Sequence, residues 1–174
     1  MIVLLSLLLL ISYGSFLYSQ DTEEANLIAA YIERFTRFIE IKGKSDSESN
    51  RRDYVLTLFG DNKYTAQFQE VFSNQKIKNR VVKITYTDNL NDLRKSDLIF
   101  VVKASDIQIQ KINDISKDNS IFTIAYLKGA AKKGIHINLF QQDKKLKFEI
   151  NNNSAKEAGI TISHLLLTKA VIIE

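Results

Sequence analysis

Apolar segments of strand length alternate with helical patterns through the middle of the chain, and this order limits the fold most. The segments are residues 54–59, 81–86, 98–102 and 121–127. Helical spacing follows the first of them at residues 64–72 and the third at residues 105–115. The last three segments are almost continuously apolar, which is typical of strands covered on both faces. The pattern therefore predicts an α/β fold with a mainly parallel sheet.

A long helix is predicted before these strands. Apolar side chains from Leu27 to Ile39 recur at the spacing of one helix face. Asp21 and Glu24 are placed to cap the start of this helix. The segment from 43 to 53 is rich in Ser, Asn and charged residues, so we expect a surface loop there.

The periodicity changes to alternation in the last third of the chain. Residues 135–140 alternate between aliphatic residues and polar or aromatic ones, and residues 146–150 alternate between apolar and charged side chains. Residues 141–145 lie between them as a turn. This predicts an antiparallel hairpin with one face in the core and the other in solvent, where His136 and Asn138 are expected. The whole pattern indicates a single three-layer, Rossmann-like domain that ends in this hairpin.

The first 20 residues contain no charged side chain, and residues 2–11 are apolar except for Ser6. This is typical of a secretory signal peptide. An uncleaved membrane anchor is the alternative, because the stretch approaches the roughly 20 residues that span a bilayer. In both cases we expect the folded domain, residues 21–174, outside the cytoplasm and in the periplasm of a Gram-negative cell.

Few residues suit catalysis. The chain contains no Cys, which excludes a thiol nucleophile and a thiolate metal site. Its glycines form neither a dinucleotide fingerprint nor a P-loop. The two histidines, His136 and His164, lack Asp, Glu or His at metal-ligand spacing. The formal net charge of +4 is modest, and the basic residues are scattered. We therefore expect no enzyme activity, no cofactor or metal, and no nucleic-acid partner.

Several segments resemble the YfiR (HmsC-like) family of exported α/β regulators. They are Phe35-Thr36-Arg37-Phe38-Ile39-Glu40, residues 134–139, residues 145–151 and residues 155–163. The resemblance extends over the predicted domain, and residues 148–166 are its most specific part. Departures are Ile41-Lys42 in place of a usual Trp-Pro, Ile135 in place of a second glycine, and the lack of cysteines. These departures leave redox gating and the partner's identity open.

The resemblance implies a non-catalytic periplasmic regulator. Such a protein binds the extracytoplasmic domain of a membrane sensor, either a diguanylate cyclase, which it restrains and so affects cyclic-di-GMP signalling and biofilm formation, or a histidine kinase. We expect its contacts on the exposed side of the first helix and on the hairpin. The residues expected to make them are Arg37, Glu40, His136, Asn138 and Lys147.

A small-molecule binding protein, which feeds a histidine kinase or a transport system, is the alternative. Ligands of parallel α/β sheets gather outside the carboxyl ends of the strands. The residues expected to contact such a ligand are Asp61, Asn62, Ser105 and Asp106. The two hypotheses are compatible, since a sensor protein can bind a metabolite and then its receptor. A second copy of the chain, in a homodimer, is a further candidate partner.

Overall fold

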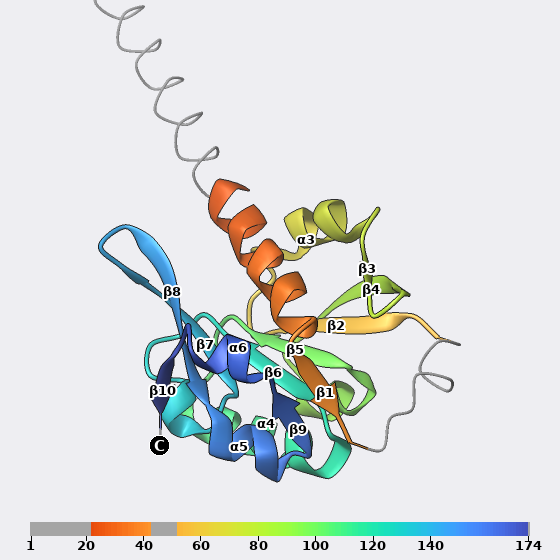
Figure 1. Ribbon diagram of the computed structural model, residues 1–174. Helices are drawn as coiled ribbons and strands as arrows, with labels where there is room; N and C mark the ends of the chain where they lie inside the picture. The colour runs from red at the N-terminus through yellow and green to blue at the C-terminus, as the bar shows by residue number, and fades with distance from the viewer. Residues whose placement is uncertain (1–21, 43–51, 174) are drawn as a thin grey trace, which may run out of the picture.

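The computed structural model describes residues 22–42 and 52–173. They form an eight-stranded, mainly parallel sheet with helices on both faces, and a separate two-stranded antiparallel sheet (Figure 1). The predicted α/β fold class is confirmed. The predicted leader, the capping residue Asp21 and most of the predicted loop over 43–53 lie outside the described residues.

The large sheet has the strand order β10-β8-β7-β6-β5-β2-β4-β3. The strands are β10 (Val171–Ile173), β8 (Lys145–Asn151), β7 (Ile137–Gln142), β6 (Phe122–Ala125), β5 (Leu98–Val101), β2 (Tyr54–Phe59), β4 (Arg80–Thr87) and β3 (Lys76–Ile77). Only the β7–β8 and β3–β4 pairs are antiparallel among these described strands. The predicted C-terminal hairpin is therefore present, and its first strand continues the parallel sheet beside β6.

Helices cover both faces of the sheet. The N-terminal helix (residues 22–36) and α3 (Thr65–Phe72) lie on one face, and α4 (Asp106–Asn119) and the 3₁₀ turn η1 (Leu90–Lys95) lie on the other. The remaining elements are β1 (Ile39–Ile41), η2 (Ala131–Lys133), α5 (Asn152–Glu157), β9 (Ile160–Ile162) and α6 (His164–Leu167). Ser105 and Gln108 form a reciprocal capping box that fixes the start of α4.

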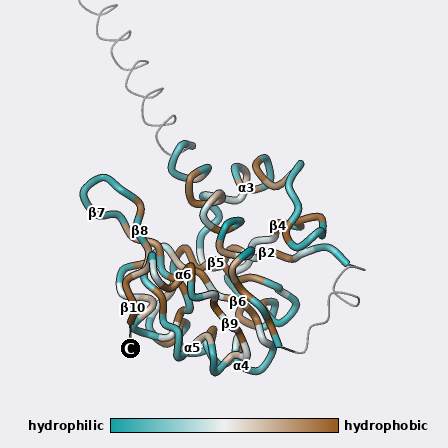
Figure 2. Tube along the Cα trace, in the orientation of Figure 1, coloured by the Kyte–Doolittle hydropathy of each residue, from teal (hydrophilic) through white to brown (hydrophobic). Residues whose placement is uncertain are grey.

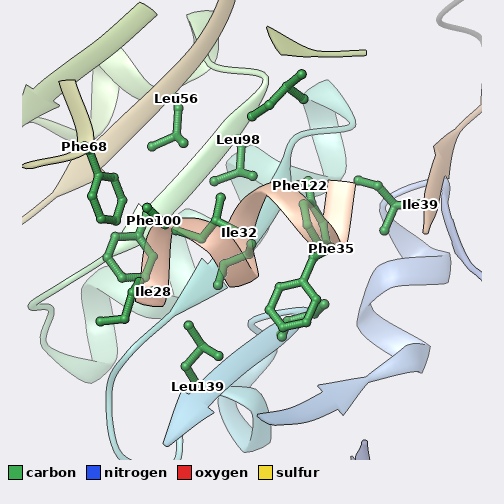
Figure 3. Packing of buried hydrophobic residues seen from close by; sticks show 14 of the residues in the cluster. Ile28, Ile32, Phe35, Ile39, Leu56, Phe68, Leu98, Phe100, Phe122 and Leu139 are labelled. Atoms are coloured by element: carbon green, nitrogen blue, oxygen red, sulfur yellow. The ribbon is translucent and has the colours of Figure 1, made fainter. Parts of the chain in front are cut away.

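The core between the N-terminal helix and the sheet is aliphatic and aromatic. Ile28, Ile32 and Phe35 of this helix lie against side chains from four strands of the sheet (Figure 3). Those side chains are Leu56 of β2, Leu98 and Phe100 of β5, Phe122 of β6 and Leu139 of β7, with Phe122 beside Phe35. Full burial of each such residue contributes about 1.5 to 3 kcal/mol. The central strands β5 and β6 are buried along their whole length, as their continuous apolar runs predicted.

The prediction that the first helix reaches Ile39 is wrong. The helix ends at residue 36, and Ile39 begins β1, where it pairs with Ile162 of β9. The backbone N–H of Ser163 donates to the carbonyl of Phe38 at 2.8 Å. Pairing with a strand more than a hundred residues later overrides the local helical spacing: it buries Ile39 and gives the backbone of residues 38–41 hydrogen-bond partners in a distant segment.

The prediction that one face of the whole hairpin is in solvent is also wrong. His136 and Asn138 are each 1% exposed. Beyond Leu139 the hairpin does project away from the body, and its tip is hydrophilic (Figure 2). The base of β7 lies between β6 and β8 in the sheet. Its Ile137 and Leu139 pack in the core that contains the N-terminal helix, and His136, just before it, contacts Ser116 of α4, so both faces are covered there.

Candidate functional site

The carboxyl ends of β6 and β7 border a cleft of about 540 Å³. Its walls include Tyr126 and Lys128, which follow β6, and Asn138, Gln141 and Glu149 from the hairpin. This edge is where parallel α/β sheets bind ligands, since loops diverge there and leave space above the strand ends. The cleft lies at the same edge of the sheet as the predicted ligand-binding residues, but it is lined by other residues, and ligand binding there stays a prediction.

Asn138 fixes the geometry of this cleft. It lies directly opposite Glu149 across the β7–β8 ladder, and its Nδ2 donates to Glu149 Oε1 at 2.9 Å. Its Oδ1 accepts a hydrogen bond from the backbone N–H of Leu127 at 3.1 Å. One buried amide thus joins the loop after β6 to both hairpin strands. Asn138 thereby orients the half-buried carboxylate of Glu149. Because Asn138 itself is buried, the prediction that it contacts a partner protein from an exposed face is wrong.

Tyr126 separates this cleft from a smaller one. The second cleft, of about 210 Å³, lies between the N-terminal helix and the hairpin and is also lined by Tyr126 and Gln141. Burial, and secondarily the carboxylate of Glu24, raises the pKa of Tyr126. The hydroxyl of Tyr64 donates a hydrogen bond to Glu24 Oε1 at 2.6 Å and so fixes the position of this carboxylate. Tyr126 is therefore a neutral phenol at physiological pH, available as a donor or acceptor to a molecule in either cleft.

The charged groups of the larger cleft define what it can bind. Glu149 supplies a carboxylate, while Lys128 and Lys132 supply ammonium groups. Phe140 and Tyr126 add aromatic surface. This set of groups is suited to a small polar molecule that carries both a hydrogen-bond donor and an anionic group. Within residues 22–42 and 52–173, no group of three or more His, Cys, Asp and Glu side chains is placed to hold a metal ion.

The predicted ligand-binding residues have local partners. Asp61 Oδ1 accepts from the backbone N–H of Lys63 at 2.9 Å, and the Asn62 carbonyl accepts from Thr65 N at 2.9 Å. Ser105 caps α4, and Asp106 pairs with Lys133 at 2.5 Å. These residues do follow β2 and β5 at the carboxyl edge, but none of them lines the two clefts beside Tyr126. Their role in ligand binding stays a prediction.

Three of the predicted partner-binding residues are exposed. Arg37 follows the N-terminal helix and pairs with Glu33 at 2.7 Å, and Glu40 lies on β1. Lys147 lies on the outer half of the hairpin, where its Nζ donates to Gln142 Oε1 at 2.9 Å. Their exposure leaves them accessible to another protein, and their contacts with a partner stay a prediction.

His136, the fourth of these residues, is enclosed in the protein instead. Its Nδ1 accepts a hydrogen bond from Thr123 N at 3.2 Å, so the proton of the neutral ring is on Nε2. Nε2 lies 3.4 Å from Ser116 Oγ, which donates to the carbonyl of Ile121 at 2.7 Å. Burial, and secondarily the charge of Lys117, lowers the pKa of His136 to about 3. His136 is a neutral packing residue, and its prediction as a surface contact is wrong.

Sequence reasoning missed Tyr126 and Glu149. Tyr126 lies within the apolar segment 121–127, which predicted a strand and no binding site. Glu149 could have been found from the strand register of the hairpin. A two-residue turn at Asp143 and Lys144 places Gln142 opposite Lys145 and therefore Asn138 opposite Glu149. Asp143 and Lys144 both have positive φ, as a type I′ turn requires, but they lack the usual Asn-Gly signature.

Comparisons with known proteins bear on this architecture. A profile of the YfiR/HmsC-like family matches residues 25–171. No curated protein sequence matches the chain significantly. Within the described residues, no helix is long and apolar enough to cross a bilayer.

Two solved structures are similar in fold. One is a conserved domain protein from Vibrio cholerae O1 biovar El Tor, with 12% identity and a TM-score of 0.52, over 69% of this chain and 54% of that one. The other is the ABC domain from Streptococcus pneumonia in complex with L-Trp, with 14% identity and a TM-score of 0.52, over 70% of this chain and 55% of that one. The chain thus spans about half the length of each, and the likeness concerns the fold alone. Because the family profile covers most of the sequence, the chain belongs to the YfiR/HmsC-like family.

Proposed function

We propose that the protein is a non-catalytic periplasmic regulator that binds the extracytoplasmic domain of a membrane-bound diguanylate cyclase and restrains it. The observation that carries this proposal is membership of the YfiR/HmsC-like family over residues 25–171. The uncharged first 20 residues support export.

Regulation of this kind requires only a difference in affinity. A regulator shifts the equilibrium between two states of its receptor, and the size of the shift equals the difference between its binding free energies for the two states. A coupling of about 1 to 3 kcal/mol changes the output by roughly 5- to 150-fold. The exposed residues Arg37, Glu40 and Lys147 supply charged groups for such binding.

The test is deletion of the gene, followed by measurement of cellular cyclic-di-GMP and biofilm mass. We expect both to rise and to be restored by the wild-type gene. A Lys147→Glu variant should restore them poorly at equal protein level. Lys83→Glu, which changes an exposed lysine of β4 at the other end of the sheet, is the matched control and should restore them fully. Unchanged cyclic-di-GMP and biofilm after deletion would argue against the proposal.

A second candidate function, small-molecule binding, is favoured by the cleft that Asn138 and Glu149 organise at the carboxyl edge. In this case the protein would feed a histidine kinase or a transport system. Because one solved structure of similar fold is a complex with L-Trp, amino acids are the first probes. A ligand at about 100 times its Kd stabilises a protein by about 2.7 kcal/mol.

Thermal unfolding with amino acids at millimolar concentration tests this function. Glu149→Gln should remove the increase in Tm. Asp61→Asn, which alters a carboxylate outside the cleft, should leave it intact. If no amino acid raises the Tm, or if Asp61→Asn alone removes the effect, the cleft beside Tyr126 is not the site.

A further inference from the structure

A cleft of about 300 Å³ opens where α4, the turn η2 and α5 meet. α4 contributes Asn113 and Lys117, which lie four residues apart and therefore on the same face of the helix. η2 contributes Lys132 and Lys133, and α5 closes the other side. This α4–α5 cleft shares only Lys132 with the cleft beside Tyr126, so the two are separate places on the molecule.

The backbone carbonyls beside the α4–α5 cleft already have donors. Three side chains donate to the loop that contains η2: Asn151 Nδ2 to the Ala131 carbonyl, Asn113 Nδ2 to the Lys133 carbonyl and Ser154 Oγ to the Gly134 carbonyl. Carbonyl and carboxylate oxygens are the ligands of hard cations such as Ca²⁺. Because these carbonyls are occupied, the cleft offers few oxygens to a cation.

Positive charge predominates in this cleft. Lys117, Lys132 and Lys133 line it together with a single carboxylate, Glu157. Lys117 pairs with Glu157 at 2.6 Å and Lys133 with Asp106 at 2.5 Å, but these two carboxylates are 58% and 74% exposed, and ion pairs of exposed groups are weak. Lys132 forms no ion pair with a carboxylate of the described residues. The cleft therefore favours an anion that several ammonium groups can contact at once.

The cleft also contains an acceptor that lacks a donor. Asn113 Oδ1 is buried and has no hydrogen-bond partner within residues 22–42 and 52–173, since Nδ2 of the same amide donates to the Lys133 carbonyl. Gly134 lets this amide lie against the loop, because a Cβ at Gly134 would overlap it. Buried polar atoms usually have a partner, so a ligand that supplies a hydroxyl group as well as an anionic group fits the cleft best.

We propose that the α4–α5 cleft binds a phosphate group, carried by a small phosphomonoester or free as inorganic phosphate. A phosphomonoester has about 1.5 to 2 negative charges at pH 7, and its three oxygens accept from several lysines at once. Small-molecule pockets have volumes of roughly 300 to 1,000 Å³, so this cleft can admit a short organic group beside the phosphate. This inference does not rest on the proposed function, which needs no ligand in this cleft.

Amide chemical shifts in a nuclear magnetic resonance titration test both the binding and its place. The probes are glycerol 3-phosphate, inorganic phosphate and glycerol, at constant ionic strength and up to about 10 mM. Glycerol 3-phosphate should shift residues 113–117, 131–134 and 151–157, and glycerol should not. Inorganic phosphate that binds as tightly as the ester would identify the free ion as the ligand, whereas binding at least tenfold weaker would identify the phosphomonoester. No shifts with either phosphate, or shifts centred on Tyr126 and Glu149, would overturn the inference.

Substitution of single lysines tests the groups that hold the anion. Lys117→Gln and Lys132→Gln should each raise the Kd of glycerol 3-phosphate at least fivefold, with unchanged circular dichroism spectra, while Lys117→Arg keeps the charge and should retain most of the affinity. Lys111→Gln is the matched control, because it removes an exposed lysine of the same helix outside the cleft, and it should bind as the wild type does. An equal loss of affinity in Lys111→Gln, or wild-type affinity in both Lys117→Gln and Lys132→Gln, would show that the ion is not bound in this cleft.

Discussion

Arg80 and Asp97 form a buried ion pair at the amino edge of the sheet, opposite the cleft. Arg80 Nη2 donates to Asp97 Oδ2 at 2.7 Å, and the two residues are 5% and 2% exposed. The same carboxylate accepts hydrogen bonds from Arg52 and from the backbone N–H of Val55. Asp97 thereby joins the beginnings of β2, β4 and β5.

Asp97→Asn should therefore lower the free energy of unfolding by about 3 to 5 kcal/mol, because it leaves the Arg80 guanidinium buried without a counter-charge. Urea denaturation at pH 7 measures the change. Arg52→Ala is the control: its side chain is 52% exposed, so its loss should cost at most about 1 kcal/mol. Equal effects of the two variants would contradict this account of the pair.

Gly60 and Gly129 should differ in their tolerance of a methyl group. Both have positive φ, but a Cβ at Gly60 would overlap the carbonyl of Lys103, whereas nothing lies within 4 Å of a Cβ at Gly129. Gly129→Ala should cost only the backbone strain, about 1 to 2 kcal/mol. Gly60→Ala should cost at least about 1 kcal/mol more, or prevent folding, since backbone atoms must move. Thermal unfolding of both proteins measures the difference, and a Gly60→Ala protein as stable as Gly129→Ala would refute the predicted overlap.

His136 should make stability depend on pH. Its pKa is about 3 in the folded protein and about 6.5 when unfolded, so the unfolded chain binds more protons between these values. The contribution of His136 to the free energy of unfolding is fully present above pH 6.5. It is lost as the pH is lowered toward 3, by at most about 1.4 kcal/mol per pH unit.

In His136→Gln this contribution is absent, and urea denaturation from pH 7 to pH 4 should show a shallower loss of stability than in the wild type. His164→Gln changes an exposed histidine and should retain the wild-type pH dependence. Parallel curves for the wild type and His136→Gln would rule out this origin of the dependence.

Asn138→Leu should destabilise the hairpin base. The change keeps a similar volume but leaves the Leu127 N–H and the Glu149 carboxylate without their partner, at a cost of about 1 to 3 kcal/mol. Gln141→Leu changes an exposed residue of the same cleft and should be close to neutral. Hydrogen exchange of the Leu127 amide gives a direct measurement: faster exchange is expected in Asn138→Leu only, and equal exchange in both variants would show that Asn138 does not hold this loop.

Local patterns predicted most elements because each depends on neighbours in the sequence. The apolar runs that became β2, β4, β5 and β6 and the helical spacing of α3 and α4 all appear in the structure. Ile39 shows where such reasoning ends, since its helical spacing was real but pairing with Ile162 decided its conformation. The predicted ligand-binding residues follow β2 and β5, whereas the cleft beside Tyr126 follows β6. The sequence could not point to this cleft, because loop residues reveal no cavity until the strands beside them are ordered, and binding at either place stays a prediction.

By itself, the sequence determined the fold class, the order of the strands along the chain and the apolar faces that form the core. The tertiary structure alone decided that His136 and Asn138 are buried, that Asn138 meets Glu149, and that Arg80 meets Asp97. The physical reason is that periodicity reports whether a side chain is apolar, whereas burial of a polar side chain depends on partners that chain topology supplies from distant segments.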